Sequence, residues 1–195
     1  MKRQAIPAAP VAKRRRGEAP PLTVSRKELL VKGSDDAFRA FVHAMFVLGA
    51  HIATIRDHFG RIVGLSGVQY AILISIARLD AGGNVNVKSL ADHIDLSGAF
   101  VTNETNKLFR AGLITKRPDN RDRRQVRLTV TAEGIRLLEE LAPKQRDVND
   151  VLFDCLSARQ FQELRTLLPS LVDSAERAMR LADYYANITP CPRRR

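Results

Sequence analysis

The fold of this 195-residue chain is decided by residues 97–131, SGAFVTNETNKLFRAGLITKRPDNRDRRQVRLTVT. The first part predicts a helix, because Ser97 can cap the free amides of its first turn and Gly112 can end it. Its few apolar residues, Val101, Leu108 and Ala111, lie towards one side. The outward side is therefore expected to be small or polar, and it carries Thr102, Asn103, Glu104, Asn106, Lys107 and Arg110.

The neighbouring residues complete a recognisable arrangement. Upstream, Asn86 can cap a short helix over 87–94, and a tight turn at 95–96 joins it to the longer helix. Downstream, the strand-like runs 113–116 and 126–130 flank an arginine-rich turn. Two helices joined by a tight turn and followed by a basic hairpin predict a winged helix-turn-helix. The expected fold class is mainly α with a small β wing.

A long amphipathic helix is predicted before this core. Ser34 can cap it, and it should run to Phe59, with Gly60 and Gly64 breaking it. Ser66 and Gln69 then have the spacing of a capping box that opens a second helix through Leu79. The apolar residues of the first helix recur at steps of three and four: Phe38, Phe41, Met45, Leu48, Ile52, Ile55 and Phe59.

Two further helices are predicted after the wing. Thr131 can cap the first, which Pro143 should bend, and Ser157 with Gln160 can open the second, where Pro169 is another expected bend. Their apolar stripes are Ile135, Leu138, Leu141, Val148, Leu152 and Cys155, then Phe161, Leu164, Leu168, Leu171, Ala175, Ala178 and Ala182. Helical seams at both ends of a small core need a partner, and a second copy of the chain would supply one.

The expected organisation therefore has five parts. They are a disordered basic arm (1–33), an N-terminal dimerisation helix (34–64), a winged helix-turn-helix domain (65–131), C-terminal dimerisation helices (132–188) and a basic tail (189–195). The net charge of +11 is concentrated at the ends, because residues 1–34 hold nine Lys or Arg against two Glu, and residues 193–195 are all arginine. The arm either keeps the protein soluble or adds contacts to phosphates.

Composition excludes several classes of protein. No apolar run approaches the roughly 18 residues of a membrane span, so we expect no membrane partner and a cytoplasmic location. Two cysteines, Cys155 and Cys191, are too few for a disulfide framework or a zinc site. The sequence has no phosphate-binding glycine loop, no His-Glu-x-x-His and no nucleophile elbow, so we expect no enzyme activity, cofactor or metal.

The arginine-rich turn predicts the main contact with double-stranded DNA. A hairpin tip is thin enough to enter the minor groove, whose negative potential attracts arginine, and Arg121, Arg123 and Arg124 are the candidates. Asp119 and Asp122 can pair with neighbouring guanidinium groups and fix which arginine points outward. The alternative interpretation is a solvated turn with internal salt bridges.

Residues 65–141 resemble the MarR family of winged-helix repressors. The resemblance rests on LSGVQYAIL (65–73), on residues 90–134, and above all on the wing, where Asp119 is followed by the run 122–124. It implies a homodimer that binds a pseudo-palindromic operator, with the terminal helices forming the dimer interface. Family positions that face bases or phosphates correspond here to Ser97, Gly98, Ala99, Phe100, Thr102, Asn103 and Lys107.

This sequence departs from the family pattern at the start of that helix. Gly98, Ala99 and Phe100 replace the polar residues common there, so apolar contact with thymine methyl groups could substitute for hydrogen bonds. The rival function is an architectural protein that coats DNA with little sequence preference. A footprint separates the two, because a repressor protects one bounded site whereas a coating protein spreads.

The family also raises the question of a signal. Some members sense peroxide through a cysteine early in the first helix, but that helix has none here, and Cys155 is expected to be a small buried residue. His43, His51 and His58 have steps of eight and seven, so they form no i, i+4 ligand pair and predict no metal site.

The remaining candidate signal is a small aromatic or heteroaromatic carboxylate. His51 and Tyr70 fall on helices that border an effector cavity in the family, and they could offer an imidazole and a phenol to such a ligand. The resemblance thus implies a repressor that the effector releases from DNA. The alternative is that both residues only pack at a domain junction.

Overall fold

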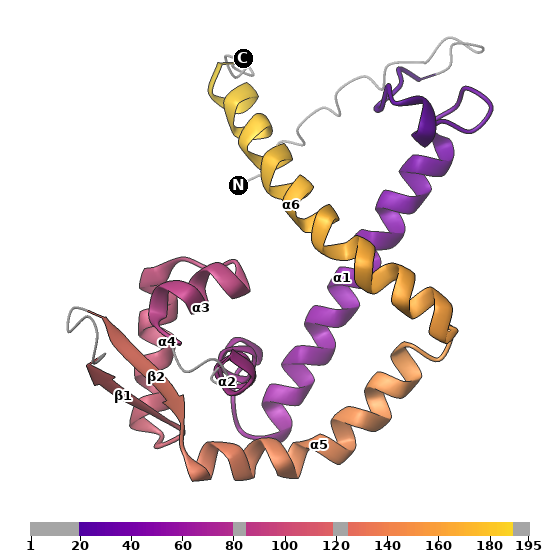
Figure 1. Ribbon diagram of the computed structural model, residues 1–195. Coiled ribbons are helices and arrows are strands. Elements are labelled where there is room, and N and C mark those ends of the chain that lie inside the picture. The colour runs from indigo at the N-terminus through magenta and orange to yellow at the C-terminus, as the bar shows by residue number, and fades with distance from the viewer. Residues whose placement is uncertain (1–19, 80–84, 119–124, 189–195) are drawn as a thin grey trace, which may run out of the picture. The chain divides into compact units, whose positions relative to one another are not determined.

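The computed structural model describes residues 20–79, 85–118 and 125–188 (Figure 1). The chain divides into two compact units, residues 1–58 and 59–195. The fold is mostly helical with one two-stranded antiparallel sheet among the described residues, which confirms the predicted fold class. The elements are the 3-10 turn η1 (Lys27–Leu29), α1 (Asp36–Ile62), α2 (Gly67–Leu79), α3 (Val87–Ile94), α4 (Gly98–Arg110), β1 (Ile114–Pro118), β2 (Val126–Val130), α5 (Ala132–Leu152) and α6 (Ala158–Ile188).

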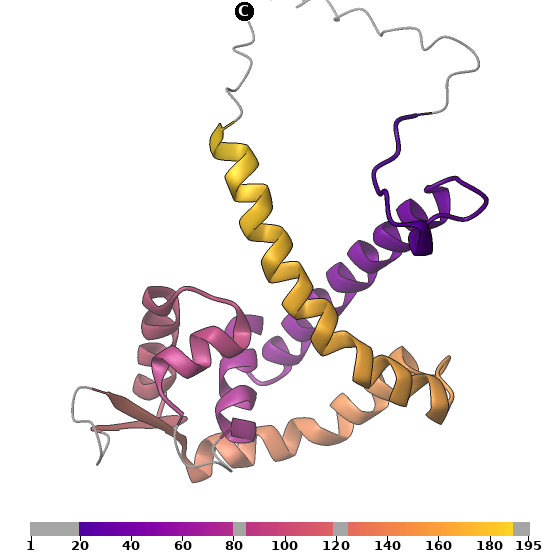
Figure 2. The ribbon, with the colours of Figure 1, turned by 45° about the horizontal axis from the view of Figure 1, so that its top comes forward.

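A hydrophobic core lies inside the second unit, around α2. This helix supplies Ile72, Leu73 and Ile76, none of which has exposed surface. In Figures 1 and 2, α3, α4 and the β hairpin lie around α2 in both views. The other buried members of the core are Val85, Leu90, Ala91, Val101, Leu108, Leu113, Ile114 and Leu128. Burial of one large aliphatic side chain stabilises the fold by roughly 1.5–3 kcal/mol, so this unit has a substantial core of its own.

The hairpin is attached to the helices by backbone hydrogen bonds. β1 and β2 pair antiparallel from Ile114↔Val130 to Pro118↔Val126. The segment before α3 adds to the sheet, because the Leu128 amide donates to the Val85 carbonyl at 2.7 Å and Asn86 forms an isolated bridge with Arg127. The base of the hairpin is therefore fixed to the start of α3 as well as to α4.

Side-chain caps begin α2 to α6 at the predicted places, whereas α1 begins at Asp36, two residues after the predicted cap Ser34, whose hydroxyl accepts from the Asp36 amide. The Ser66 hydroxyl accepts from the backbone N–H of Gln69, and the side-chain Oε1 of Gln69 accepts from the backbone N–H of Ser66, which completes the predicted capping box. Further capping boxes are formed by Asn86 with Ser89 and by Ser157 with Gln160. Single caps are formed by Ser97 and Thr131. Because each cap depends on a few consecutive residues, the sequence alone predicts it well.

Gly60 does not break the first helix, which contradicts the prediction. α1 runs on to Ile62, and Gly64, at φ +72°, lies in the turn after it. A Cβ atom at Gly60 would lie 2.7 Å from the carbonyl carbon and oxygen of Ser66. Gly60 therefore permits the close approach of the chain that enters α2, a tertiary requirement that a helix-breaking interpretation misses.

The segment before α1 is tied to its first turn. Asp35 is buried, and one of its carboxylate oxygens accepts from both the amide and the hydroxyl of Thr23, each at 2.6 Å. Its other oxygen accepts from Arg39 Nε at 3.0 Å, and Arg39 also donates to the Pro21 carbonyl. These bonds hold the pKa of Asp35 well below its usual value. The sequence predicts a disordered arm through residue 33, but residues 20–33 are folded back here; residues 1–19 lie outside the described part.

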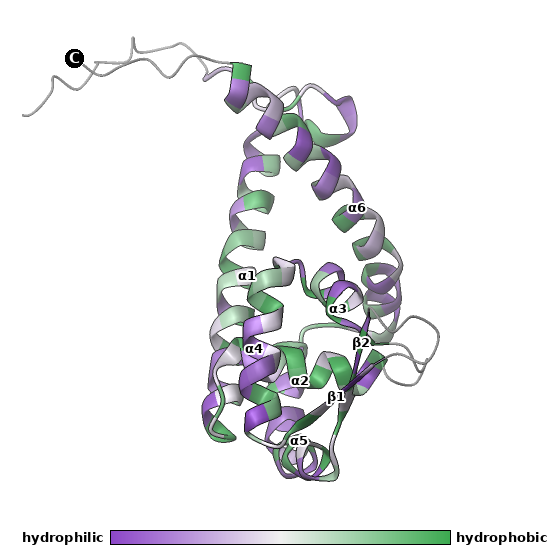
Figure 3. Ribbon diagram, turned by 90° about the vertical axis from the view of Figure 1, so that its left-hand side faces the viewer, coloured by the Kyte–Doolittle hydropathy of each residue, from purple (hydrophilic) through white to green (hydrophobic). Residues whose placement is uncertain are grey.

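The terminal helices leave many apolar side chains exposed. α6 has no buried residue, and Leu164, Leu168 and Leu171 of its predicted stripe are 39–46% exposed. In the hydropathy colouring of Figure 3, hydrophobic and hydrophilic residues alternate along α6. On α1, Phe41, Met45, Leu48 and Ile52 are exposed as well.

α1 also corrects the expectation that no segment approaches the length of a membrane span. By length and composition alone it could cross a membrane, because Arg39 is the only charged residue between positions 37 and 55. An apolar helix that packs on other protein helices has the same length and composition, so these two properties do not make α1 a membrane span.

Candidate nucleic-acid interface

α4 presents the residues that the sequence assigns to DNA recognition. All seven of them, Ser97, Gly98, Ala99, Phe100, Thr102, Asn103 and Lys107, are exposed. Val101, Thr105 and Leu108 are buried against the core. Ser97 caps the helix by accepting from the Phe100 amide, which leaves the first turn ordered at the surface. α4 thus has one face anchored in the core and an opposite face open to a ligand.

Glu104 departs from the predicted pattern, because it is buried and not on the polar outward side. Only 7% of the residue is exposed, and its Oε1 lies 2.7 Å from Lys107 Nζ. Its Oε2 accepts from Gln69 Nε2 at 3.0 Å, which links α4 to the cap of α2. The Lys107 hydrogen bond is the main reason that the pKa of Glu104 lies below its usual value. A signal was present in the sequence, since residue 104 follows Val101 by three positions and precedes Leu108 by four.

Lys116 of β1 joins the hairpin to α4. Its ammonium donates to Thr105 Oγ1 at 2.9 Å and to Asn106 Oδ1 at 2.7 Å. Partial burial lowers the pKa of Lys116. Lys116 therefore fixes the wing against the recognition helix.

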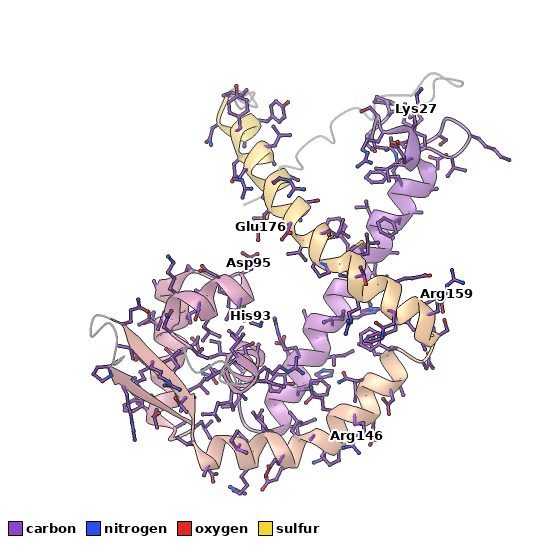
Figure 4. The ribbon with its side chains drawn as sticks, viewed as in Figure 1. Lys27, His93, Asp95, Arg146, Arg159 and Glu176 are labelled. Atoms are coloured by element: carbon purple, nitrogen blue, oxygen red, sulfur yellow. The ribbon has the colours of Figure 1, made fainter. Side chains whose placement is uncertain are left out.

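The residue before β2, at the end of the hairpin next to the turn, also contacts the start of α3. Asn86 Nδ2 donates to Gln125 Oε1 at 2.8 Å. A groove of about 570 Å³ is lined here by Asn86, Val87, Lys88, Ser89, Asp92, Gln125 and Val126. His93 and Asp95 mark the other end of α3 in Figure 4. The hairpin is therefore held by side chains on two sides, by α4 through Lys116 and by α3 through Asn86.

The three arginines predicted for the minor groove, Arg121, Arg123 and Arg124, lie outside the described residues. The structure describes the strands on each side of them, which end at Pro118 and begin at Val126. Their role as DNA contacts stays a prediction.

The two candidate effector residues belong to different units. Tyr70 is 5% exposed, and its ring packs edge to face on Phe59 with centroids 5.8 Å apart. Burial raises the pKa of Tyr70, while Arg78 and Gln145 act in the opposite direction. His51 is exposed on α1. Packing of Tyr70 agrees with the alternative interpretation of this residue, and its role towards an effector stays a prediction.

Cys155 and the histidines complete the predicted candidates. Cys155 is exposed, which contradicts the expectation of a buried residue, because α5 ends at Leu152 and Cys155 falls in the turn before α6. His43, His51 and His58 are exposed on α1. Within the described ranges, no group of three or more His, Cys, Asp or Glu residues could hold a metal ion.

Comparison with known proteins places this geometry in a family. The model of the MarR family matches residues 65–126. YhbI of Bacillus subtilis (strain 168), an uncharacterized HTH-type transcriptional regulator, is 32% identical over 109 residues, which are 56% of this chain and 69% of that protein.

Solved structures show the same fold at lower identity. AbsC, a MarR family transcriptional regulator from Streptomyces coelicolor, has a TM-score of 0.64 at 18% identity, covering 72% of this chain and 95% of AbsC. The MepR–DNA complex of S. aureus has a TM-score of 0.59 at 18% identity, covering 69% of this chain and 97% of MepR. With its winged unit (α2 to β2), its matched family model and its relative in B. subtilis, the chain belongs to the MarR family of winged-helix transcriptional regulators.

Proposed function

We propose that the protein is a homodimeric regulator that binds a specific double-stranded DNA site. The exposed face of α4 carries this proposal, because a helix anchored on one side and open on the other can lie in the major groove. S. aureus MepR, which has a similar fold, was solved bound to DNA. The site of action would be the cytoplasm.

The wing would supply a second contact in the adjacent minor groove. Lys116 holds the hairpin to α4, and Asn86 holds it to the start of α3, so the described strands of the wing are fixed relative to the recognition helix. Arg121, Arg123 and Arg124 follow β1 in the sequence and would contact the groove there. Helix and wing together would cover two neighbouring grooves.

Readout of sequence would depend partly on apolar contact. Phe100 is 41% exposed in the first turn of α4, beside Gly98 and Ala99, which offer no hydrogen-bonding side chain. The C5 methyl group of thymine is the apolar feature of the major groove, and burial of one methyl is worth about 0.8 kcal/mol, roughly fourfold in affinity.

Selection from a random duplex library with the full chain tests both the specific binding of DNA and the role of Phe100 in reading it. We expect enrichment of a pseudo-palindrome with thymines at fixed positions in each half-site. Replacing these thymines one at a time by uracil, which lacks only the methyl group, should weaken binding roughly fourfold at positions that Phe100 contacts. In Phe100→Ala the same replacement should have no effect. A library without enrichment would contradict specific binding, and equal uracil effects in both proteins would contradict the role of Phe100.

The dimer would form through the terminal helices. The exposed apolar residues of α1 and α6 need cover, and the resemblance to the family points to a second copy. Two copies of α4 would then enter successive major grooves about one helical turn apart.

Release from DNA by a small aromatic or heteroaromatic carboxylate is the proposed signal, and repression is the proposed role. A ligand that prefers a dimer with α4 off the groove spacing must weaken DNA binding, and DNA must weaken the ligand equally. Titration of the DNA complex with a panel of such acids tests this. We expect release at micromolar concentration, and Tyr70→Phe with His51→Ala should blunt release while DNA binding persists. Acids that change neither the melting temperature nor the complex would exclude this class of effector.

A further inference from the structure

The proposed interface does not use the Glu104 carboxylate of α4. It is acidic, it lies on the recognition helix and it is 7% exposed. Negative charge near a DNA-binding surface opposes binding, so its presence there needs a physical reason. Its hydrogen-bond partners supply one.

Both carboxylate oxygens of Glu104 are engaged by side chains in fixed positions. Oε2 accepts from Gln69 Nε2 at 3.0 Å, and Gln69 is itself held by the Ser66 amide, which donates to its Oε1 at 3.1 Å. Oε1 accepts from Lys107 Nζ at 2.7 Å, one turn along α4. Glu104 therefore cannot turn outward without breaking its link to the cap of α2.

The pairing restrains Lys107 in return. A buried carboxylate is costly without a cationic partner, and Gln69 is neutral. If the Lys107 ammonium moved away to bind a phosphate, the Glu104 carboxylate would stay buried with only the Gln69 side-chain amide as a partner. An ammonium has three N–H donors, so Lys107 can keep Glu104 and still donate to one DNA acceptor close by. Its side chain is 57% exposed, which leaves those donors accessible.

We propose that Glu104 is a positioning residue that holds Lys107 and cancels its charge, so that Lys107 contributes little to sequence-independent binding of the phosphate backbone. The inference rests on the proposed DNA-binding function. The pairing of Glu104 with Lys107 would limit the charge-driven affinity of the recognition helix for arbitrary DNA and would keep a hydrogen-bond donor at a defined place.

Salt dependence on a duplex of arbitrary sequence measures the effect, because each phosphate that a free cation neutralises adds about 0.9 to the slope of log affinity against log salt. The test uses the full chain and a labelled duplex of shuffled sequence. Glu104→Gln keeps the side-chain volume and removes the charge. We expect it to steepen the slope by about 0.9 and to raise affinity roughly 5- to 10-fold near 0.1 M salt.

Two further variants test whether Lys107 causes that change in slope. Lys107→Met in the native background should alter the slope by much less than 0.9, whereas Lys107→Met added to Glu104→Gln should return the slope to the native value. A merely structural role of Glu104 would change the melting temperature without this reversal. If Glu104→Gln alone does not fold, the double variant still tests the proposal, because it removes both charges together. Its slope should equal the native slope, whereas loss of a lysine that neutralised a phosphate in the native protein would lower the slope by about 0.9.

Glu163→Gln is the matched control for net charge. Glu163 pairs with Arg159, one turn away on α6, where Figure 4 labels Arg159, and both side chains are well exposed. We expect this variant to leave the slope unchanged. An equal steepening in Glu163→Gln, an unchanged slope in Glu104→Gln, or a steepening that survives removal of Lys107 would overturn the proposal. Failure of the native protein to bind the duplex at any salt concentration would instead overturn the DNA-binding function on which it rests.

Discussion

The winged unit and the terminal helices use apolar residues in opposite ways. In the winged unit, Ile72, Leu73 and Ile76 of α2 are wholly buried, and buried residues of α3, α4 and the hairpin pack with them. On α6, a 31-residue helix, no residue is buried, and apolar side chains such as Leu168 and Tyr184 are about half exposed. The winged unit therefore has its own core, whereas the long helices carry exposed apolar surface that a partner could bury.

This difference separates two tasks. A recognition helix must keep one geometry in every molecule, so it is fixed by the core and by polar links such as Lys116 to Asn106. Dimerisation needs surface that remains open until the partner arrives. We infer that changes in α6 affect assembly, and that changes in the winged unit affect folding or DNA contact.

The largest effect is expected from charges on the apolar stripe of α6. Leu164→Glu with Leu171→Glu should give a folded monomer, because two carboxylates cannot be buried in a helical seam. Since each half-site then binds alone, affinity for the selected DNA site should fall by about two orders of magnitude or more. Sedimentation velocity and a binding titration measure the two effects. Gln162→Glu, at an exposed polar position of α6, is the control, and a stable double-mutant dimer would contradict the role of the stripe.

The wing should show the next largest effect. Arg123→Ala and Arg124→Ala should each weaken specific binding by about 1–3 kcal/mol and lower the salt slope by about one. Removal of residues 1–16, which belong to the terminal part, should instead weaken binding to all DNA at low salt and preserve the preference for the specific site. Competition titrations with shuffled duplex measure that preference. Equal loss of preference in both experiments would contradict this division of labour.

Glycine substitutions compare the packing of the start of α5 on the winged unit with the packing of α1. A Cβ atom at Gly134 would lie 2.4 Å from the Leu113 carbonyl oxygen, whereas none of the described atoms lies within 4 Å of a Cβ at Gly49 of α1. Gly134→Ala should therefore lower the free energy of unfolding by about 1–3 kcal/mol, and Gly49→Ala should not lower it. Thermal unfolding of both variants provides the measurement. A comparable loss at Gly49 would show that α1 is as tightly packed as the winged unit.

The smallest effect is expected at the clasp formed by Asp35, Thr23 and Arg39. Hydrogen bonds from Arg39 and Thr23 depress the pKa of Asp35 below its usual 3.8, so the clasp should be fully formed above about pH 4 and should weaken as the pH falls further. The rate of hydrogen exchange at the Thr23 backbone amide, which donates to Asp35, measures how fully the clasp is formed. Asp35→Asn should speed that exchange at neutral pH, and unchanged exchange would mean that the clasp does not order this segment.

Local chemistry explains what the sequence could predict. The boxes at Ser66 and Ser157 and the caps at Asn86, Ser97 and Thr131 depend on three or four consecutive residues, so pattern and structure agree. Tertiary contacts explain what it could not. Gly60 is needed by the chain at Ser66, which no local pattern reveals.

The candidate site divides in the same way. Exposure of the α4 residues follows from their helical spacing, and the burial of Glu104 was available from the same spacing. Its link to Gln69 spans 35 positions and required the structure. The exposure of Cys155 likewise depends on where α5 ends, and helix ends are the least certain part of a sequence-based interpretation.

A hydroxyl-radical footprint of the full chain on its selected site tests the central claim most directly. The account predicts two protected stretches, about 10 base pairs apart, with boundaries that do not move as protein concentration rises. Lys107 and the α4 face of each protomer would lie at their centres. Protection that spreads along the duplex with concentration and shows no fixed boundary would contradict the account and would favour a protein that coats DNA.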